Sequence, residues 1–391
     1  MTSGLLHGQL DARFEPLRDV LEDSLGSVAD CGLSLVVDVD GRTAVDVYGG
    51  FADEARTRPW ERDTIVNVWS TTKTVTSLAV LMLADRGLVD LDAPVARYWP
   101  EFAAQGKEDV LVRHLMSHTS GVAGWDTPFA FEDMYDLERS TAALAAQAPW
   151  WEPGTASGYH ALSFGHLLGE IVRRVTGKSL TRFVDEEIAG PLDADFQIGA
   201  RQADWDRCAE IIPPPPLPFD LASLDPASVL VKVATGPVAN ATAPNSAPWR
   251  LAEIGAANGH GNARSVARIM SVLALGGAVG GTGAADGTGA AVRLLSPATI
   301  EHVFREQTHG IDLFLGVPIR FGIGYGLPEP VGVRFVPEGR VCFWGGWGGS
   351  LIIMDLDRRT TISYMMNKMQ PGLVGSDIAA GYLKVIYELL G

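Results

Sequence analysis

A serine and a lysine stand three residues apart in the segment Ser70-Thr71-Thr72-Lys73. Residues at this spacing lie one above the other on a helix, so the amine of Lys73 can reach the hydroxyl of Ser70. An amine in that position can activate a serine as a nucleophile without a histidine base. At the start of a helix, the backbone N–H of Ser70 would also lie where an oxyanion is stabilised. The spacing is equally typical of an N-cap serine followed by a solvated lysine.

A tyrosine in the turn-rich segment 153–161 is the next candidate. Tyr159 could act as a base, but a free tyrosine has a pKa of about 10 and needs help to ionise at neutral pH. A neighbouring ammonium such as Lys73 could supply that help by stabilising the phenolate. The alternative is a core tyrosine whose hydroxyl is hydrogen-bonded.

The segment 343–350 is rich in glycine and follows a predicted strand. Glycines at a strand end allow a substrate to lie close against the backbone. The backbone N–H of Trp347 is our candidate to join that of Ser70 in an oxyanion hole. The alternative is a bulge or a hairpin turn.

Two histidines, His114 and His118, have the spacing of a helical zinc pair, but no glutamate follows His114 and no third ligand stands out. We therefore predict helix-end packing and capping for them, and no metal site. The sequence also lacks Gly-x-Ser-x-Gly, which argues against the nucleophile elbow of an α/β-hydrolase.

Hydrophobic periodicity and turn residues predict the elements that position these segments. The nucleophile follows an extended stretch, 64–69, and begins a helix that ends near Gly87. Asp40-Gly41 separates two alternating runs and is typical of a hairpin turn. The other predicted elements are helices over 13–28, 162–175 and 378–390, and strands over 32–39, 43–50, 341–344, 351–354 and 361–366.

We expect the N-terminal and C-terminal strands to pair in one antiparallel sheet with the terminal helices packed on it. A chain of 391 residues can bury a large core, and no linker separates independent domains. The prediction is a single domain, 1–391. It comprises an α/β region of approximately 1–87 plus 300–391 and an inserted, mostly helical region of approximately 88–299.

Taken in order, these motifs resemble the serine β-lactamase/penicillin-binding-protein superfamily, specifically the class C-like branch that includes the family VIII carboxylesterases. The segments that carry the resemblance are Ser70-x-x-Lys73, 87–95, 98–100, 114–121, 153–155 with Tyr159, 261–265 and 344–350. The resemblance implies an α+β, β-lactamase-like fold. An antiparallel sheet flanked by helices would face a mostly helical region, with the active site in the cleft between them.

The resemblance also implies roles. Ser70 would be the acyl-forming nucleophile, with Lys73 and Tyr159 as its proton-handling partners; which of the two accepts the serine proton stays open. Trp344-Gly345-Gly346 takes the place of the family's third motif, where β-lactamases and peptidases usually carry a cation that attracts the substrate carboxylate. Position 161 is alanine where the family commonly has asparagine. Both departures suit a neutral ester.

Aromatic side chains are abundant around these motifs. Trp344 and Trp347, with Trp69 and Trp125, are our candidates for the lining of an acyl or alcohol pocket. The substrate-binding prediction also includes Gly345 and Gly346.

The composition excludes several classes of function. A net charge of −16 disfavours nucleic acids and anionic membranes, and no run of about 18 apolar residues predicts a membrane helix. The start of the chain lacks the pattern of a signal peptide, so we expect a cytoplasmic protein. Three distant cysteines, Cys31, Cys208 and Cys342, are expected to be reduced.

The sequence therefore predicts a serine carboxylesterase that hydrolyses short-chain, small-molecule esters through an acyl-enzyme, without a cofactor. The alternative is an amide hydrolase of the same fold, such as a β-lactamase, a D-aminopeptidase or an oligomeric-amide hydrolase. A non-catalytic scaffold is a further alternative, which the complete Ser70, Lys73 and Tyr159 set argues against. The oligomeric state is left open, a homo-oligomer included.

Overall fold

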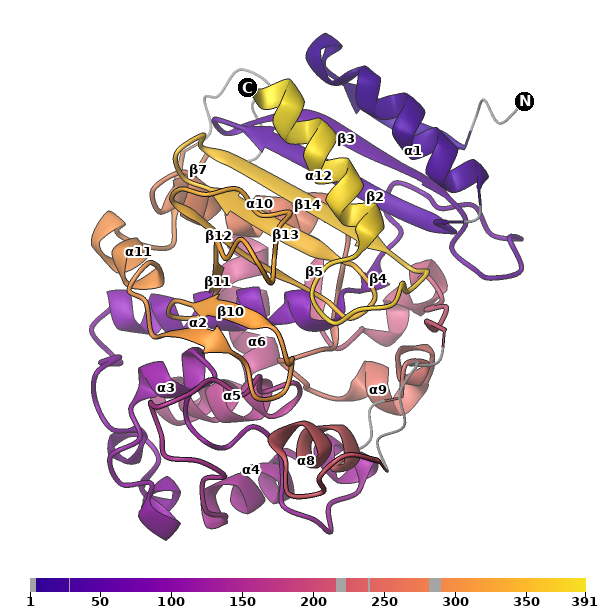
Figure 1. Cartoon of the computed structure of the whole chain (residues 1–391). Coiled ribbons are helices and arrows are strands. Elements are labelled where there is room, and N and C mark those ends of the chain that lie inside the picture. Colours follow the sequence, from indigo (N-terminus) through magenta and orange to yellow (C-terminus); the bar gives the residue numbers. More distant parts are fainter. Residues whose placement is uncertain (1–4, 28, 216–222, 238–239, 281–289) are drawn as a thin grey trace.

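The computed structural model describes residues 5–27, 29–215, 223–237, 240–280 and 290–391 (Figure 1). Within them, the largest sheet is antiparallel and has the strand order β1-β3-β2-β14-β13-β12-β11-β10-β9. Its strands are β1 Leu6–Leu10, β2 Gly32–Val39, β3 Arg42–Gly50, β9 Thr308–Ile311, β10 Pro318–Phe321, β11 Gly326–Leu327, β12 Val341–Gly345, β13 Leu351–Asp355 and β14 Thr360–Met366.

The first and last parts of the chain meet at the centre of this sheet. Strand β14 pairs with β2 in antiparallel register, with Ser363 opposite Val36. Between β2 and β3, Asp40 (φ 51°) and Gly41 (φ 79°) both take the left-handed conformation that a two-residue hairpin turn requires. The predicted hairpin and the predicted pairing of the chain ends are both confirmed.

Helices cover both faces of the sheet (Figure 1). Helices α1 (Pro16–Gly26) and α12 (Asp377–Leu390) pack against each other on one face. The buried carboxylate of Asp30 ties α12 to β14, because it accepts hydrogen bonds from Tyr364 (2.7 Å) and Tyr382 (2.6 Å). Helix α10 (Ala263–Ala274) packs against β14, β2 and β13, although its residues fall in the range assigned to the helical region.

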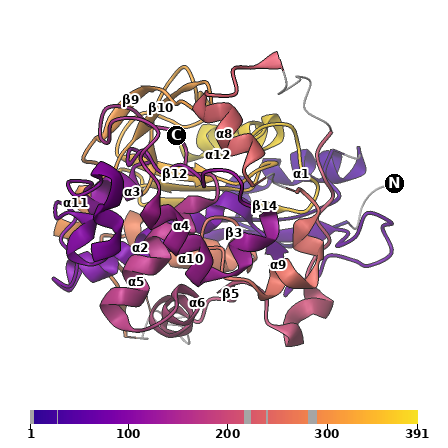
Figure 2. The same ribbon diagram turned by 90° about the horizontal axis from the view of Figure 1, so that it is seen from below.

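Most of the other helices gather below the sheet, with α11 beside it (Figure 1), and Figure 2 shows them from below. Their bounds are α2 Thr72–Asp85, α3 Val112–Met116, α4 Leu137–Ala146, α5 Ser163–Thr176, α6 Leu180–Val184, α7 Gly190–Leu192, α8 Val229–Thr235, α9 Ala247–Leu251 and α11 Pro297–Val303. Short strands make two small sheets: β4 Val66–Asn67, β5 Phe196–Ile198 and β6 Gly259–Gly261, and β7 Ala278–Val279 with β8 Val292–Arg293.

Helix α2 is the element on which the site depends. Residues 72–83 of this helix are all buried, because α5 and α6 pack against it from the helical region while α10 and β12 contact it from the sheet side. A polar residue on α2 is therefore removed from water unless it faces a cleft. No helix in the described parts of the chain is both long and apolar enough to cross a bilayer. Cys31, Cys208 and Cys342 are buried free thiols, as predicted.

Candidate active site

Ser70 lies in a tight turn between β4 and α2. Within the stretch 64–69, predicted to be a strand or otherwise extended, a strand forms at Val66–Asn67, and the chain then enters a single 3₁₀ turn, Trp69–Thr71. Trp69 takes a positive φ of 49°, which is rare for a residue with a bulky side chain. Such strained residues persist only where the surrounding structure holds them, and they cluster at functional sites.

The turn is held by the connection between β12 and β13, residues 346–350. The hydroxyl of Ser350 donates to the carbonyl of Val68 (2.8 Å) and lies 3.1 Å from the hydroxyl of Thr71. Gly346 allows this approach, because a Cβ there would stand 2.2 Å from Ser350 Oγ and 2.5 Å from Val68 O. The glycine-rich segment therefore packs directly against residues 68–71, which we call the nucleophile turn because it carries the candidate nucleophile Ser70.

The amine of Lys73 points at Ser70. Lys73 Nζ lies 3.0 Å from Ser70 Oγ, 2.8 Å from the carbonyl oxygen of Ala161 and 2.9 Å from that of Ala256. The lysine is only 2% exposed, and no carboxylate in the described chain forms an ion pair with it. Burial without a counter-charge disfavours the ammonium, so the pKa of Lys73 is well below its ordinary value.

The contacts of Lys73 Nζ favour the neutral form of the amine. A neutral amine has two hydrogens to donate, and two carbonyl oxygens, of Ala161 and Ala256, are within reach. Its lone pair then faces the third neighbour, Ser70 Oγ, from which it can accept a proton. The geometry can thus turn Lys73 into a general base for Ser70.

Tyr159 joins the pair from the segment before α5. Its hydroxyl accepts a hydrogen bond of 2.9 Å from Trp344 Nε1 and also interacts by hydrogen bonding with the side chain of Ser70. Lys73 Nζ lies 4.7 Å from the centre of the Tyr159 ring. Ser70, Lys73 and Tyr159 thus meet at one place, although they come from segments about 90 residues apart.

The phenol of Tyr159 is held in its neutral form. Burial raises its pKa above the ordinary value, hydrogen bonds from Ser70 and Trp344 oppose this rise, and the carboxylate of Asp312 adds to it. This differs from the expectation that Lys73 lowers the pKa of Tyr159. The same burial that penalises the phenolate also removes the positive charge from Lys73.

Two histidines that sequence reasoning assigned to helix ends lie nearby. His114 Nδ1 accepts the N–H of Leu111 at the start of α3 (3.2 Å), which is the capping role predicted for it. His118 instead lies edge-on to Tyr159, with ring centres 4.8 Å apart, and its Nδ1 accepts the N–H of His160 (3.1 Å). Burial lowers the pKa of His118 well below its ordinary value, so its ring is neutral. The described residues contain no group of three or more side chains that could hold a metal ion.

The backbone donors proposed for the oxyanion are unoccupied. Among the described residues, neither the N–H of Ser70 nor that of Trp347 has a hydrogen-bond acceptor, whereas Thr71 N–H bonds to Val68 O and Gly348 N–H to Gly372 O. The two donors belong to the two segments that Gly346 brings together. They remain a prediction for the oxyanion hole.

The four tryptophans predicted for the pocket divide into two groups. Trp69 precedes Ser70 and contacts Trp347 edge-on (5.1 Å between ring centres), and Trp344 donates to Tyr159, so these three are linked to the candidate site. Trp125 stacks on Phe129 and donates to the carbonyl of Ser140, and no described contact links it to Ser70. Sequence reasoning missed a further aromatic pair beside Trp69. Trp249 lies 5.5 Å from the Trp69 ring and stacks on Phe131.

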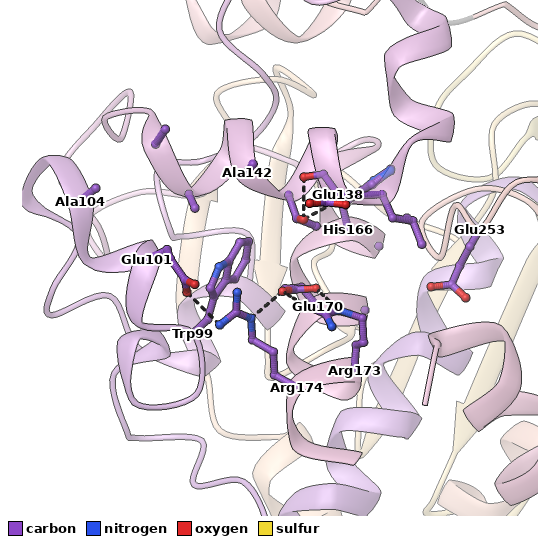
Figure 3. Close-up of a pocket in the computed structure, with 16 residues that line it drawn as sticks. Trp99, Glu101, Ala104, Glu138, Ala142, His166, Glu170, Arg173, Arg174 and Glu253 are labelled. Carbon is purple, nitrogen blue, oxygen red and sulfur yellow. Dashed lines mark hydrogen bonds and ion pairs between the residues drawn. The ribbon is translucent and has the colours of Figure 1, made fainter. Parts of the chain in front are cut away.

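A separate cavity of about 780 Å³ lies between α4, α5 and the 3₁₀ segment η4 (Pro100–Gly106) (Figure 3). Its wall includes the ion pairs of Glu170 with Arg173 and Arg174, and Arg174 also pairs with Glu101. Ser70, Lys73 and Tyr159 do not line it. Its size therefore says nothing about the substrate of Ser70.

A serine, a buried lysine and a tyrosine meet at one place on this α+β scaffold, which is the scaffold of the β-lactamase-type serine hydrolases. The sequence profile of the Beta-lactamase family matches residues 17–384. The chain therefore belongs to the Beta-lactamase family, and the fold that the sequence predicted is confirmed.

Relatives with known names include esterases. The chain is 36% identical over 370 residues to "Esterase/beta-lactamase LipL" of Mycobacterium tuberculosis, covering 92% of this chain and 82% of that protein. It is 37% identical over 160 residues to "Esterase EstB" of Burkholderia gladioli, covering 37% of this chain and 40% of that one.

Solved structures agree over nearly the whole chain. A family VIII carboxylesterase superposes with a TM-score of 0.89 at 36% identity, covering 98% of this chain and 99% of the other. A penicillin-binding protein homologue from Caulobacter crescentus superposes with a TM-score of 0.87 at 34% identity, with the same coverage.

The close approach at Gly346 leads to a testable prediction. Gly346→Ala places a methyl group against Ser350 Oγ and Val68 O, so the end of β12 must move away from the nucleophile turn. A displacement of about 1 Å in a catalytic group can cost about 10²-fold in rate, and we expect a loss of that order in kcat. Steady-state kinetics on an aryl ester measures it.

The matched control is Gly310→Ala, in β9 of the same sheet, where an added Cβ meets nothing within 4 Å. It should leave the rate unchanged. Equal rates for Gly346→Ala and Gly310→Ala would contradict the role given to Gly346.

Proposed function

We propose that the protein is a serine carboxylesterase that hydrolyses short-chain carboxylic esters of small molecules through an acyl-enzyme. The observation that carries the proposal is the contact of Lys73 Nζ with Ser70 Oγ at 3.0 Å, inside a buried site that contains Tyr159. The esterase names of LipL, EstB and the family VIII carboxylesterase support the choice of reaction.

The proposed reaction begins with a proton transfer from Ser70 to the neutral amine of Lys73. Ser70 Oγ forms a bond to the ester carbonyl carbon, and the carbonyl oxygen becomes an oxyanion that the N–H groups of Ser70 and Trp347 stabilise. The C–O bond to the alcohol then breaks, and Tyr159 hands a proton to the leaving oxygen while Lys73 returns its proton to the tyrosine. Water then attacks the carbonyl carbon of the acyl-enzyme with the proton transfers reversed. Tyr159 takes a proton from the water as it passes its own to Lys73, and Lys73 returns a proton to Ser70 Oγ when the acid leaves.

The surroundings of the third motif favour an ester over an anionic amide. Trp344 is neutral, and its single N–H is already donated to Tyr159, so it offers nothing to a substrate carboxylate. Ala161 has no side-chain group to bond a substrate amide, and its carbonyl oxygen is occupied by Lys73. Recognition then depends on the apolar faces of Trp69 and Trp347.

Replacing the nucleophile tests the proposal. Ser70→Ala should lower kcat/KM for an aryl butyrate by at least about 10⁴-fold, since removal of a catalytic serine costs even more in other hydrolases. The thermal midpoint should stay close to that of the wild type. Mass spectrometry after treatment with a fluorophosphonate should place the label on Ser70. Ser179→Ala, at the N-cap of α6, is the matched control and should remain fully active.

The same assay compares the butyrate with a chromogenic cephalosporin and a D-alanyl amide. We expect kcat/KM for the ester to exceed both amide values by more than tenfold. A higher value for either amide would place the protein among the amide hydrolases. Turnover retained in Ser70→Ala would rule out any mechanism in which Ser70 is the nucleophile.

The tyrosine has a separate test. Tyr159→Phe keeps the ring contacts with His118 and Trp344 but removes the hydroxyl that interacts with Ser70. Loss of a positioned acid or base costs about 10²–10⁴-fold in rate, and we expect kcat to fall within that range. A fall of less than tenfold would mean that Lys73 handles the proton alone.

The pH dependence follows from the buried amine. Lys73 must be neutral to accept the serine proton, so kcat/KM should rise with pH through the lowered pKa of Lys73. Ordinary lysines titrate at about 10.4, and the rise should be complete well below that pH. Because the pKa of Tyr159 is raised, the phenol should not cause a fall in rate in the neutral range. A profile that still climbs near the ordinary lysine value would contradict the assignment of Lys73 as the base.

A further inference from the structure

The hairpin that joins β9 to β10 reaches into the site through Asp312. This carboxylate is completely buried. Its Oδ1 accepts the backbone N–H of Tyr159 (3.0 Å) and those of Phe314 and Leu315 (both 2.9 Å). One oxygen thus fixes the backbone of the catalytic tyrosine and the conformation of the hairpin tip together.

Two further contacts join the tip to the tyrosine segment. The N–H of Leu313 donates to the carbonyl of Ser157 (2.8 Å). Phe314 stacks against the ring of Tyr159, with 6.2 Å between ring centres and 20° between planes. The hairpin tip therefore covers the face of Tyr159, and Asp312 stands at the base of that cover.

The burial of the other oxygen of Asp312, Oδ2, does not stabilise the fold. Oδ2 is buried and has no hydrogen-bond partner among the described residues. A buried polar atom without a partner costs stability, and a charged one costs more. An apolar side chain or an asparagine would avoid a buried charge here, so the carboxylate is better explained by the tyrosine that it touches.

The charge of Asp312 also acts on the phenol. The titratable groups that face Tyr159 are Lys73 from α2, His118, whose ring lies edge-on to it, and Asp312, with His160 next along the chain. Burial lowers the pKa of both histidines, that of His160 to about 3, so both are neutral at working pH. Burial is the largest cause of the raised pKa of Tyr159, and Asp312 adds to it because it disfavours a second negative charge nearby.

We infer that Asp312 is a positioning residue for the ester hydrolysis: it fixes the backbone of Tyr159, holds Phe314 over the tyrosine ring and adds a negative charge to the surroundings of the tyrosine. The inference rests on the proposed function. It assigns to the carboxylate the task of presenting Tyr159 as a proton donor, while Lys73 takes the serine proton.

Asp312→Asn separates charge from geometry. The asparagine oxygen can still accept the three N–H bonds, so kcat and KM at neutral pH should stay within threefold of the wild type. Without the negative charge, the phenol ionises more easily, and the alkaline fall in kcat should begin at a lower pH. Rates are measured with an aryl butyrate from pH 7 up to the highest pH at which the enzyme stays folded, with spontaneous hydrolysis subtracted. A pH profile that superimposes on the wild type would overturn the electrostatic part.

Asp312→Ala removes the anchor as well. We expect kcat to fall about 10²-fold, with KM within threefold, because a displaced catalytic group loses rate more than binding. Unchanged kcat in this variant would overturn the positioning part. Glu329→Gln is the matched control: it is buried at the same end of the sheet, its Oε2 accepts the N–H of Val331, and it should change neither kcat nor the pH profile.

A second readout does not depend on turnover. Ultraviolet titration of the phenolate, with the spectrum of Tyr159→Phe subtracted in each background, should show Tyr159 ionising at lower pH in Asp312→Asn than in the wild type. This separates the two proposals. A wild type that ionises as expected but hydrolyses no ester would defeat the proposed function alone, and unchanged ionisation in an active enzyme would defeat the role of Asp312 alone.

Discussion

The burial of one amine governs the rest of the site. Lys73 lies on a helix whose first three turns are buried, and the carbonyl oxygens of Ala161 and Ala256 receive its hydrogens. Without a carboxylate partner the ammonium is disfavoured, so the amine is available as a base. In the proposed mechanism, this burial of an amine without a counter-charge is what activates Ser70. The same burial disfavours the charged phenolate of Tyr159, so the phenol stays protonated.

Three distant parts of the chain must be held around that amine. The sheet brings β12 to the nucleophile turn, where Ser350 bonds the carbonyl of Val68 and Gly346 leaves room for the contact. The segment before α5 carries Tyr159 and is fixed by two side chains, His118, which accepts the N–H of His160, and Asp312, which accepts the N–H of Tyr159. The geometry of the candidate site therefore depends on how the sheet packs against the helices, and a shift of either layer changes it.

Local patterns in the sequence were enough to predict the hairpin at Asp40-Gly41, the helix over 162–175 and the strands at the C-terminal end, because each depends on neighbouring residues. The Ser70–Lys73 contact was predictable for the same reason, since three residues make one helical turn. The bonds of Trp344 to Tyr159 and of Asp312 to the Tyr159 backbone join residues more than 150 positions apart, and no local signal announces them. A lone carboxylate in the apolar run 311–315 was the one available hint. The ionisation of Lys73 and Tyr159 was misjudged because burial, which decides it, is set by the whole fold.

The ionisation of Lys73 is the most direct test of the proposed mechanism. The chain has six lysines, so ¹³C NMR of lysine labelled at Cε resolves few signals, and Lys73→Arg and Lys107→Met assign the two buried ones. We predict that the Lys73 signal titrates well below the range of the exposed lysines in the folded enzyme. A Lys73 signal that remains that of an ammonium up to the pH at which exposed lysines titrate would contradict the central claim.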